Sequence, residues 1–434
     1  MNCSLVVPES GRSLAPIQTG SGGVFGPPTG APSGAPLDTD GVNSSHEGNP
    51  ASVEAYRERL RLRGFLWLVS SDRAVSACGR CRQRRKGSDH AEPVTVKVGP
   101  SGVGLSGLQR CAKVWICPVC SVAVWGERSM EIGMLAAAHV AAGGRILFVT
   151  LTTRHHVPDR LDGLVGYLRA GWDGVVKGRA GLALVDALGV AGYVRSMEIN
   201  YGGNGWHPHY HVAFFVGGDV TKEQADRVIG EAFDRWSRAV VKAGGKVPLE
   251  QAQDVRLFGA ADSDDLAKYL TKTLIDSGRS GSGSARARVD RTSAAEVGER
   301  LGRELTQGQR KRARRFFGTR PARALLVDAL TDGDAEALEL WHEYEKATHR
   351  VRGISWSRGL RAKYGLGAER TEQEIVDDDR GGVPVMVLTN AGVARLIGWP
   401  ELLADMGQAY RAGDYMGLRN FMDTNGIGYE EIGK

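Results

Sequence analysis

Three histidines alternate within a short stretch of this chain, at His207, His209 and His211. Residues 207–216 (HPHYHVAFFV) predict a strand, in which alternate side chains share one face. Residues 191–200 predict a second strand, and the intervening 201–206 (YGGNGW) is typical of a hairpin turn, because glycine and asparagine reach positive φ easily. Folding about this turn brings Glu198 close to the row of imidazoles.

A carboxylate and two imidazoles on one sheet surface form an open metal site with free positions for water or phosphate. The residues alone leave the choice of histidines open. His209 and His211 flank a bulky hydrophobic residue, whereas His207 precedes Pro208 at the start of the strand. We therefore expect His207 to lie behind the ligands or to contact DNA. The alternative is a structural row of histidines; three of them beside a glutamate favour the metal site.

A second chemical pattern lies in residues 264–274 (DDLAKYLTKTL), which predict a helix. Tyr269 follows Asp265 by four residues and precedes Lys272 by three, so the three side chains share one helix face. A phenol is a poor nucleophile when neutral, but a nearby ammonium and a metal-bound phosphate favour the phenolate. Asp265 is then a candidate general base for water, or an orienting group. An ordinary surface helix is the alternative, and the preceding histidine hairpin argues against it.

Taken in order, FVTLT (148–152), HPHYH (207–211) and YLTK (269–272) resemble the motifs of the HUH endonucleases. The similarity is greatest to the replication initiator (Rep) proteins of rolling-circle plasmids that use a single tyrosine. It covers residues 145–276, and HPHYH is its most specific part. The resemblance implies an α+β fold with a central antiparallel sheet of ferredoxin-like HUH type, carrying the metal site on its face.

The resemblance also implies roles for residues. His209 and His211 would be metal ligands for Mg²⁺ or Mn²⁺, with Glu198 as the third. Tyr269 would join covalently to a 5′-phosphate and leave a free 3′-OH, and Lys272 would contact phosphate. The family places a glutamate one helical turn before the tyrosine to activate water for the terminating cleavage. Here that position holds Asp265, which is one methylene shorter.

Two pairs of cysteines, Cys78-x-x-Cys81 and Cys117-x-x-Cys120, precede these motifs. Four thiolates in two such pairs suit tetrahedral Zn²⁺, so we expect a structural zinc site. Cys111 is a spare that is able to replace one ligand, and buried free thiols are the alternative. Such a module should need its metal to fold.

A basic run follows the tyrosine helix. Arginines at helical spacing contact phosphates, and this run therefore predicts DNA binding; the alternative is a solvated charged face. The run consists of Arg310, Lys311, Arg312, Arg314 and Arg315.

Composition favours some classes of protein and argues against others. The 434 residues include 56 Lys and Arg against 50 Asp and Glu, a net charge of +6 that favours a polyanionic partner. No apolar run is long enough to span a membrane, and the N-terminus lacks the pattern of a secretory signal. Six cysteines in so long a chain are not a disulfide scaffold, so we expect a cytoplasmic protein.

Changes in composition predict five regions. These are a disordered tail (1–50), a zinc-binding module (51–126), the endonuclease domain (127–278), a Gly/Ser/Arg-rich linker (279–299) and a basic helical C-terminal region (300–434).

The predicted function is that of a plasmid rolling-circle replication initiator that nicks one strand at the double-strand origin and later rejoins it. Its partners would be origin DNA, double-stranded and single-stranded at the nick, together with a host helicase and polymerase, and no membrane. Two alternatives remain open: an HUH-type transposase or relaxase, and a non-catalytic DNA-binding regulator. A relaxase is disfavoured because its tyrosine usually precedes the histidines.

Overall fold

The computed structural model describes residues 50–84, 87, 90–99, 102–259, 294–306, 319–378 and 382–433. The chain forms two compact units. The first combines the described parts of 1–112, 117–120 and 376–434, and the second contains residues 113–116 and the described parts of 121–375.

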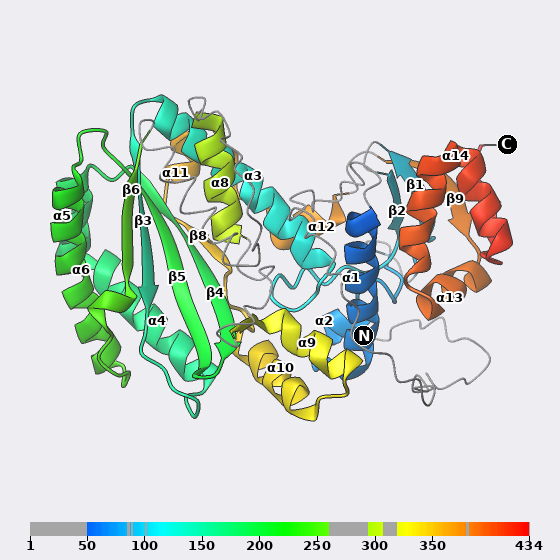
Figure 1. Cartoon of the computed structure of the whole chain (residues 1–434). Helices are drawn as coiled ribbons and strands as arrows, with labels where there is room; N and C mark the ends of the chain where they lie inside the picture. The colour runs from blue at the N-terminus through cyan, green and yellow to red at the C-terminus, as the bar shows by residue number, and fades with distance from the viewer. Residues whose placement is uncertain are drawn as a thin grey trace, which may run out of the picture. The chain divides into compact units, whose positions relative to one another are not determined.

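The second unit is built on a long antiparallel sheet (Figure 1). Its strands are β3 (Arg145–Thr152), β4 (Gly192–Gly202), β5 (Gly205–Val216), β6 (Asp254–Phe258), β7 (Arg320–Pro321) and β8 (Ile354–Trp356). Its helices are α3 (Cys120–Ala141), α4 (Leu161–Val176), α5 (Gly178–Leu188), α6 (Lys222–Lys242), η1 (Glu250–Ala252), α8 (Ala294–Thr306), α9 (Ala322–Thr331), α10 (Ala335–Ala347), α11 (Leu360–Lys363) and α12 (Glu372–Asp377).

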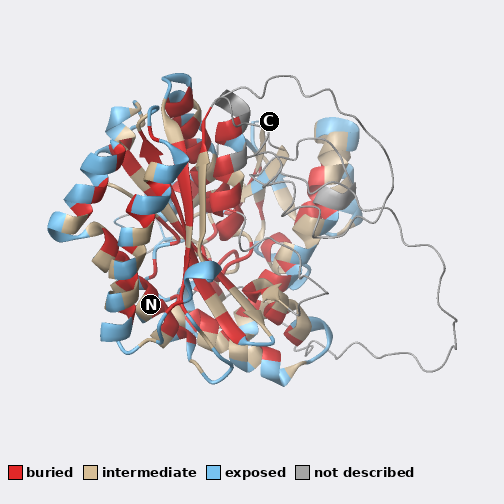
Figure 2. Cartoon of the chain, turned by 60° about the vertical axis from the view of Figure 1, so that its left-hand side comes forward, coloured by how far each residue is buried: buried red, intermediate tan, exposed pale blue. Residues whose placement is uncertain are grey.

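The strand order is β6-β3-β5-β4-β7, and β8 also pairs with β4. Strand β5 lies in the middle, and every one of its residues except His207 is buried. A strand whose two faces are both covered needs apolar side chains on both, which explains the continuous run VAFFV at its C-terminal end. Figure 2 shows the resulting pattern, with buried strands between helices whose outer faces are exposed.

The two faces of this sheet have different partners. On one face, Tyr210 of β5 lies edge-on to Trp172 of α4 and Trp236 of α6. On the other face, Phe215 of β5 contacts His139 of α3 with 5.3 Å between ring centroids. Because the row of histidines alternates with Tyr210, it lies on the α3 face, away from the α4–α6 layer.

Helix α4 approaches the tryptophan of α6 closely at a glycine. A Cβ at Gly171 would lie 2.7 Å from the ring of Trp236. We therefore expect Gly171→Ala to destabilise the protein by about 1–3 kcal/mol, because the buried indole has little room to shift. Gly166→Ala in the same helix is the matched control. Nothing lies within 4 Å of a Cβ there, and better helix propensity should stabilise the protein by about 0.5–1 kcal/mol. Urea denaturation measures both, and equal effects would contradict the packing argument.

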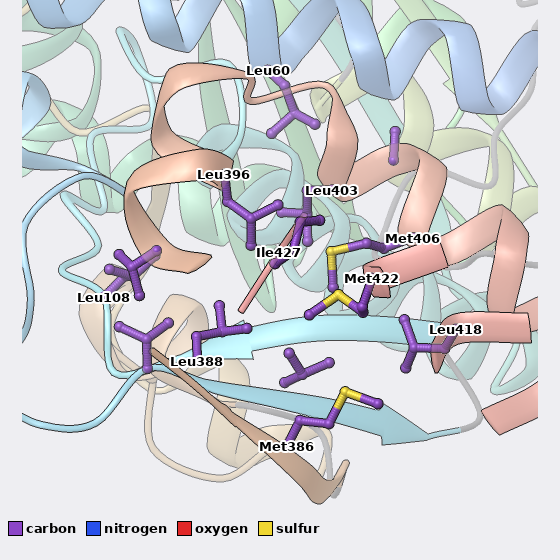
Figure 3. Packing of buried hydrophobic residues seen from close by; sticks show 14 of the residues in the cluster. Leu60, Leu108, Met386, Leu388, Leu396, Leu403, Met406, Leu418, Met422 and Ile427 are labelled. Atoms are coloured by element: carbon purple, nitrogen blue, oxygen red, sulfur yellow. The ribbon is translucent and has the colours of Figure 1, made fainter. Parts of the chain in front are cut away.

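The first unit combines segments from both ends of the described chain. Its elements are α1 (Pro50–Val69), α2 (Arg73–Ala77), β1 (Thr95–Gly99), β2 (Gly102–Ser106), β9 (Val383–Leu388), α13 (Asn390–Gly398), α14 (Leu402–Thr424) and β10 (Tyr429–Glu431). They form an antiparallel sheet of order β10-β9-β1-β2. Figure 3 shows the core between this sheet and the helices, where Leu60 of α1 packs near Leu396 and Leu403.

The α+β class with antiparallel sheets and a largely helical C-terminal region is confirmed, as is the histidine hairpin. The structure differs from the predicted elements in two helices. The sequence pattern of 159–188 predicts one helix, but the structure has two helices that meet at Lys177, where the backbone is extended and Gly178 takes a positive φ of 69°. The pattern also predicts a helix over 127–139, and in the structure this helix begins at Cys120. The sequence indicates a C-terminal region that is separate from the N-terminal module. In the structure, β9 of the C-terminal region pairs with β1 in one sheet.

Among the residues that the structure describes, no helix combines the length and apolar character that crossing a membrane requires.

Candidate functional site

The hairpin of β4 and β5 places Glu198 directly opposite His209, and Ser196 opposite His211. Its tight turn depends on Gly205, which has a φ of 81° and whose Cβ, if present, would lie 2.9 Å from the backbone of Val157. The expectation that the turn brings Glu198 close to the imidazoles is therefore confirmed, and the carboxylate shares a face with them.

Glu198, His209 and His211 converge on one point. The Nε2 atoms of the two histidines lie 3.1 Å apart, and Glu198 Oε2 lies 3.3 Å from His211 Nε2 and 3.6 Å from His209 Nε2. All three residues are buried, with 4–7% exposure. Bonds of about 2.1 Å to one ion, at right angles, separate ligand atoms by about 3 Å, so this spacing fits a divalent cation.

The carboxylate is oriented by a neighbour on its own strand. Asn200 donates a hydrogen bond from Nδ2 to Glu198 Oε1, at 2.9 Å. Because one carboxylate oxygen accepts from this amide, the other is directed to the histidines. Asn200 was not predicted from the sequence, although its spacing of two residues from Glu198 places it on the same face.

His207 lies beside these three residues and is not a member of the group. Its Nε2 is 3.0 Å from Thr152 Oγ1, and its ring stacks on His155 with 4.7 Å between centroids. Burial, reinforced by the neighbouring His209, lowers the pKa of His207 to about 3. A neutral imidazole at this place suits the predicted position behind the ligands, and a role in DNA contact stays a prediction.

The catalytic helix predicted from the sequence lies outside the described residues. This applies to Asp265, Tyr269 and Lys272, and also to the basic run 310–315. Strand β6 begins with Asp254 opposite Thr150, at the histidine end of β3, and ends with Phe258 opposite Ile146, farther from the histidines.

A second cluster of possible metal ligands lies in the first unit. The Sγ atom of Cys78 is 3.8 Å from that of Cys117 and 3.6 Å from that of Cys120, and Cys111 Sγ is 3.8 Å from Cys120 Sγ. Zinc–sulfur bonds of about 2.3 Å in a tetrahedron separate the sulfurs by about 3.8 Å, so the arrangement fits Zn²⁺.

The membership of this cluster differs from the sequence-based prediction. Cys81 was expected as the fourth ligand, and the structure gathers Cys111 with the other three. The reason is backbone pairing between two segments that are distant in sequence. Arg82 forms an antiparallel β-bridge with Leu108, and the Gly79 N–H donates a hydrogen bond to Gln109 O at 2.7 Å. These bonds hold the segment before Cys111 against the first cysteine pair. Cys81 is also buried there.

The electrostatics of the cluster favour a charged thiolate. Hydrogen bonds from the thiols of Cys111, Cys117 and Cys120 hold the pKa of Cys78 well below its usual range, and the positive charge of Arg63 acts in the same direction. Arg63 is itself buried, with 6% exposure. Thiolates are the form that binds metal. Hydrogen bonds to Cys117, Cys120 and Cys78 raise the pKa of Cys111, so charging all four thiols would require the positive charge of a bound cation.

Two comparisons with known proteins bear on this site. The family model "Replication protein" matches residues 105–272, a stretch that contains the hairpin and Tyr269. The protein named "Protein rep" from Streptomyces lividans is 31% identical over 340 residues, which cover 67% of this chain and 71% of that protein. The chain belongs to the Rep family of plasmid replication initiators.

Another relative of this Rep protein carries a different name. The "Neomycin resistance protein" from Streptomyces cyanogenus is 26% identical over 296 residues, covering 56% of this chain and 67% of that protein. The search of solved structures found no match.

Proposed function

We propose that this Rep protein is an HUH-type nicking and joining enzyme of rolling-circle replication. In the cytoplasm it binds the double-strand origin, cuts one strand with Tyr269 to leave a 5′-phosphotyrosyl link and a free 3′-OH, and later rejoins the ends. The observation that supports this best is the convergence of Glu198, His209 and His211 on the sheet of a Rep family member.

The three converging side chains would hold Mg²⁺ or Mn²⁺. When bound, the ion would supply positive charge to the non-bridging oxygens of the phosphate being cut. The candidate ligands all come from β4 and β5, so an ion held by them would have other positions for the phosphate. Burial of the ligands lowers the local dielectric, which strengthens this electrostatic effect.

The chemical step in this proposal uses the phenol of Tyr269. The phenol loses its proton to water and its oxygen attacks phosphorus. The bond from phosphorus to the 3′-oxygen breaks, and the 3′-oxygen takes a proton from water to become the free hydroxyl. Lys272 would stabilise the phenolate and contact the phosphate, and Asp265 would orient the tyrosine or activate water in the terminating cleavage.

The cysteine cluster has a structural role in this proposal, with Zn²⁺ held by Cys78, Cys111, Cys117 and Cys120. The basic run 310–315 would contact origin DNA. The 3′-OH and the opened strand would be used by a host polymerase and helicase.

Replacing Cys117 with serine is expected to release zinc and destabilise the first unit, because structural zinc contributes folding energy directly. Zinc content measured by mass spectrometry should fall from about one ion per chain to well below it. Cys3→Ser, outside the described residues, is the control and should keep its zinc. Cys111→Ser should lose zinc in the same way, because Cys111 belongs to the same cluster. Wild-type protein that lacks zinc, or Cys117→Ser that retains it, would contradict the proposal.

The function is tested with supercoiled plasmid that carries the protein's own origin. Wild-type protein with Mn²⁺ or Mg²⁺ should convert it to nicked circles with protein attached to the 5′ end, and EDTA should prevent the reaction. Binding without nicking under either metal would favour a DNA-binding regulator. Cleavage only of transposon ends or transfer origins would favour a transposase or relaxase.

A further inference from the structure

Strand β3 lies beside the histidines of β5 for its whole length. Its pairing places Thr150 opposite His211 and Thr152 opposite His209. Directly opposed residues of an antiparallel pair share a face, with Cβ atoms about 4.5–5.5 Å apart. The even-numbered residues of β3 therefore face the candidate metal site, and Val149 and Leu151 face the opposite layer.

Two residues of β3 hold the imidazole of His211. Thr150 Oγ1 lies 3.1 Å from His211 Nδ1, within hydrogen-bond distance. The ring of Phe148 stacks on the same imidazole, with 5.4 Å between centroids and an interplanar angle of 24°. The hydrogen bond engages the Nδ1 atom of His211, and the stacking restricts the plane of its ring.

The hydrogen bond has a consequence for the proton on His211. A neutral imidazole carries one proton, and the nitrogen that lacks it offers the lone pair that binds a metal. His211 Nε2 faces Glu198 Oε2 at 3.3 Å and His209 Nε2 at 3.1 Å, so it is the nitrogen that would bind. The proton must then lie on Nδ1, where the Thr150 hydroxyl oxygen can accept it.

The other ligands have comparable supports from different groups. His209 Nδ1 lies 3.4 Å from the backbone oxygen of His207, and Asn200 donates to Glu198 Oε1. Of these three supports, the one to His211 comes from a side chain of another strand, β3. It is also the shorter of the two contacts to a histidine Nδ1. Because Thr150 lies on β3, this contact can be removed by substitution without changing the β4–β5 hairpin.

We propose that Thr150 and Phe148 are positioning residues of the metal site. Thr150 keeps His211 in the Nδ1–H tautomer, which leaves Nε2 free to bind the cation, and Phe148 holds the ring plane toward Glu198. This inference rests on the proposed metal site. It gives a physical reason for threonine at position 150 of the FVTLT segment, since valine would have the same shape but no acceptor.

The test is the affinity of the full-length protein for Mn²⁺ without DNA, measured by isothermal titration calorimetry. Thr150→Val removes the oxygen and keeps the shape, and we expect it to raise the dissociation constant about 10- to 100-fold. Thr150→Ser keeps the oxygen and should bind within a few-fold of wild type. Thr331→Val, an exposed position on α9, is the matched control and should bind as wild type does.

The tautomer is read separately in metal-free protein. With ¹⁵N-labelled histidine, the nitrogen chemical shifts of His211 should show a proton on Nδ1 in wild type and a mixture of tautomers in Thr150→Val. Melting curves of the metal-free variants check folding. Unchanged affinity and tautomer in Thr150→Val, with Mn²⁺ bound by wild type, would overturn this inference alone. Wild type that binds no Mn²⁺ would overturn the proposed metal site as well.

Discussion

Replacing Tyr269 with phenylalanine is expected to abolish nicking of origin plasmid, with a loss of about 10³-fold or more, and to eliminate the covalent protein–DNA adduct. The physical reason is that phenylalanine keeps the ring and removes the oxygen that is proposed to attack phosphorus. The measurement is a time course of supercoiled-to-nicked conversion in Mn²⁺, followed by denaturing gels that retain protein-linked DNA.

The control for this variant is Tyr167→Phe. Tyr167 belongs to α4, which covers the face of the sheet opposite the histidines, so loss of its hydroxyl should leave nicking unchanged. Origin binding by Tyr269→Phe should equal that of wild type in a gel-shift assay. Nicking that persists in Tyr269→Phe at the wild-type rate would reject Tyr269 as the nucleophile and leave the metal site to be judged by its own variants.

Replacing His211 with alanine is expected to have the second large effect, a loss of Mn²⁺ binding together with a fall in nicking of about 10²-fold or more. His211 Nε2 lies within 3.3 Å of both other candidate ligands, so its removal leaves only two ligand atoms at the site. It also removes the stacking partner of Phe148, so melting temperature must be measured alongside. Calorimetry with Mn²⁺ and the plasmid assay give the two readouts.

His349→Ala is the matched control, because His349 is exposed and is not one of the gathered ligands. It should bind Mn²⁺ and nick DNA as wild type does. Full Mn²⁺ affinity in a folded His211→Ala protein would mean that the ion binds elsewhere. Loss of Mn²⁺ binding with unchanged nicking would mean that the reaction does not need an ion at this site.

Much of the candidate metal site was predictable because its geometry is local. A two-residue period along 207–211 puts three imidazoles on one face, and a short glycine-containing turn brings Glu198 opposite His209. Both features depend on backbone stereochemistry over about twenty residues, and tertiary contacts did not alter them.

The supports of the site were not predictable in the same way. Thr150 is 61 residues from His211 in sequence, and only the register between β3 and β5 brings their side chains together. A shift of that register by one residue would turn Thr150 to the opposite layer. The FVTLT segment identifies a strand, but its partner and alignment come from the packing of the whole sheet.

The sequence by itself determined the hairpin with its alternating histidines and the presence of cysteine pairs, because each follows from short-range spacing. The tertiary structure alone decided that Cys111 joins Cys78, Cys117 and Cys120, and that β9 completes a sheet with β1. Spacing cannot rank five cysteines, because the choice depends on which loops are held together by bonds such as Gly79 N–H to Gln109 O. Strand partners hundreds of residues apart are likewise chosen by burial of a shared core, here the one that joins Leu60 to Leu403.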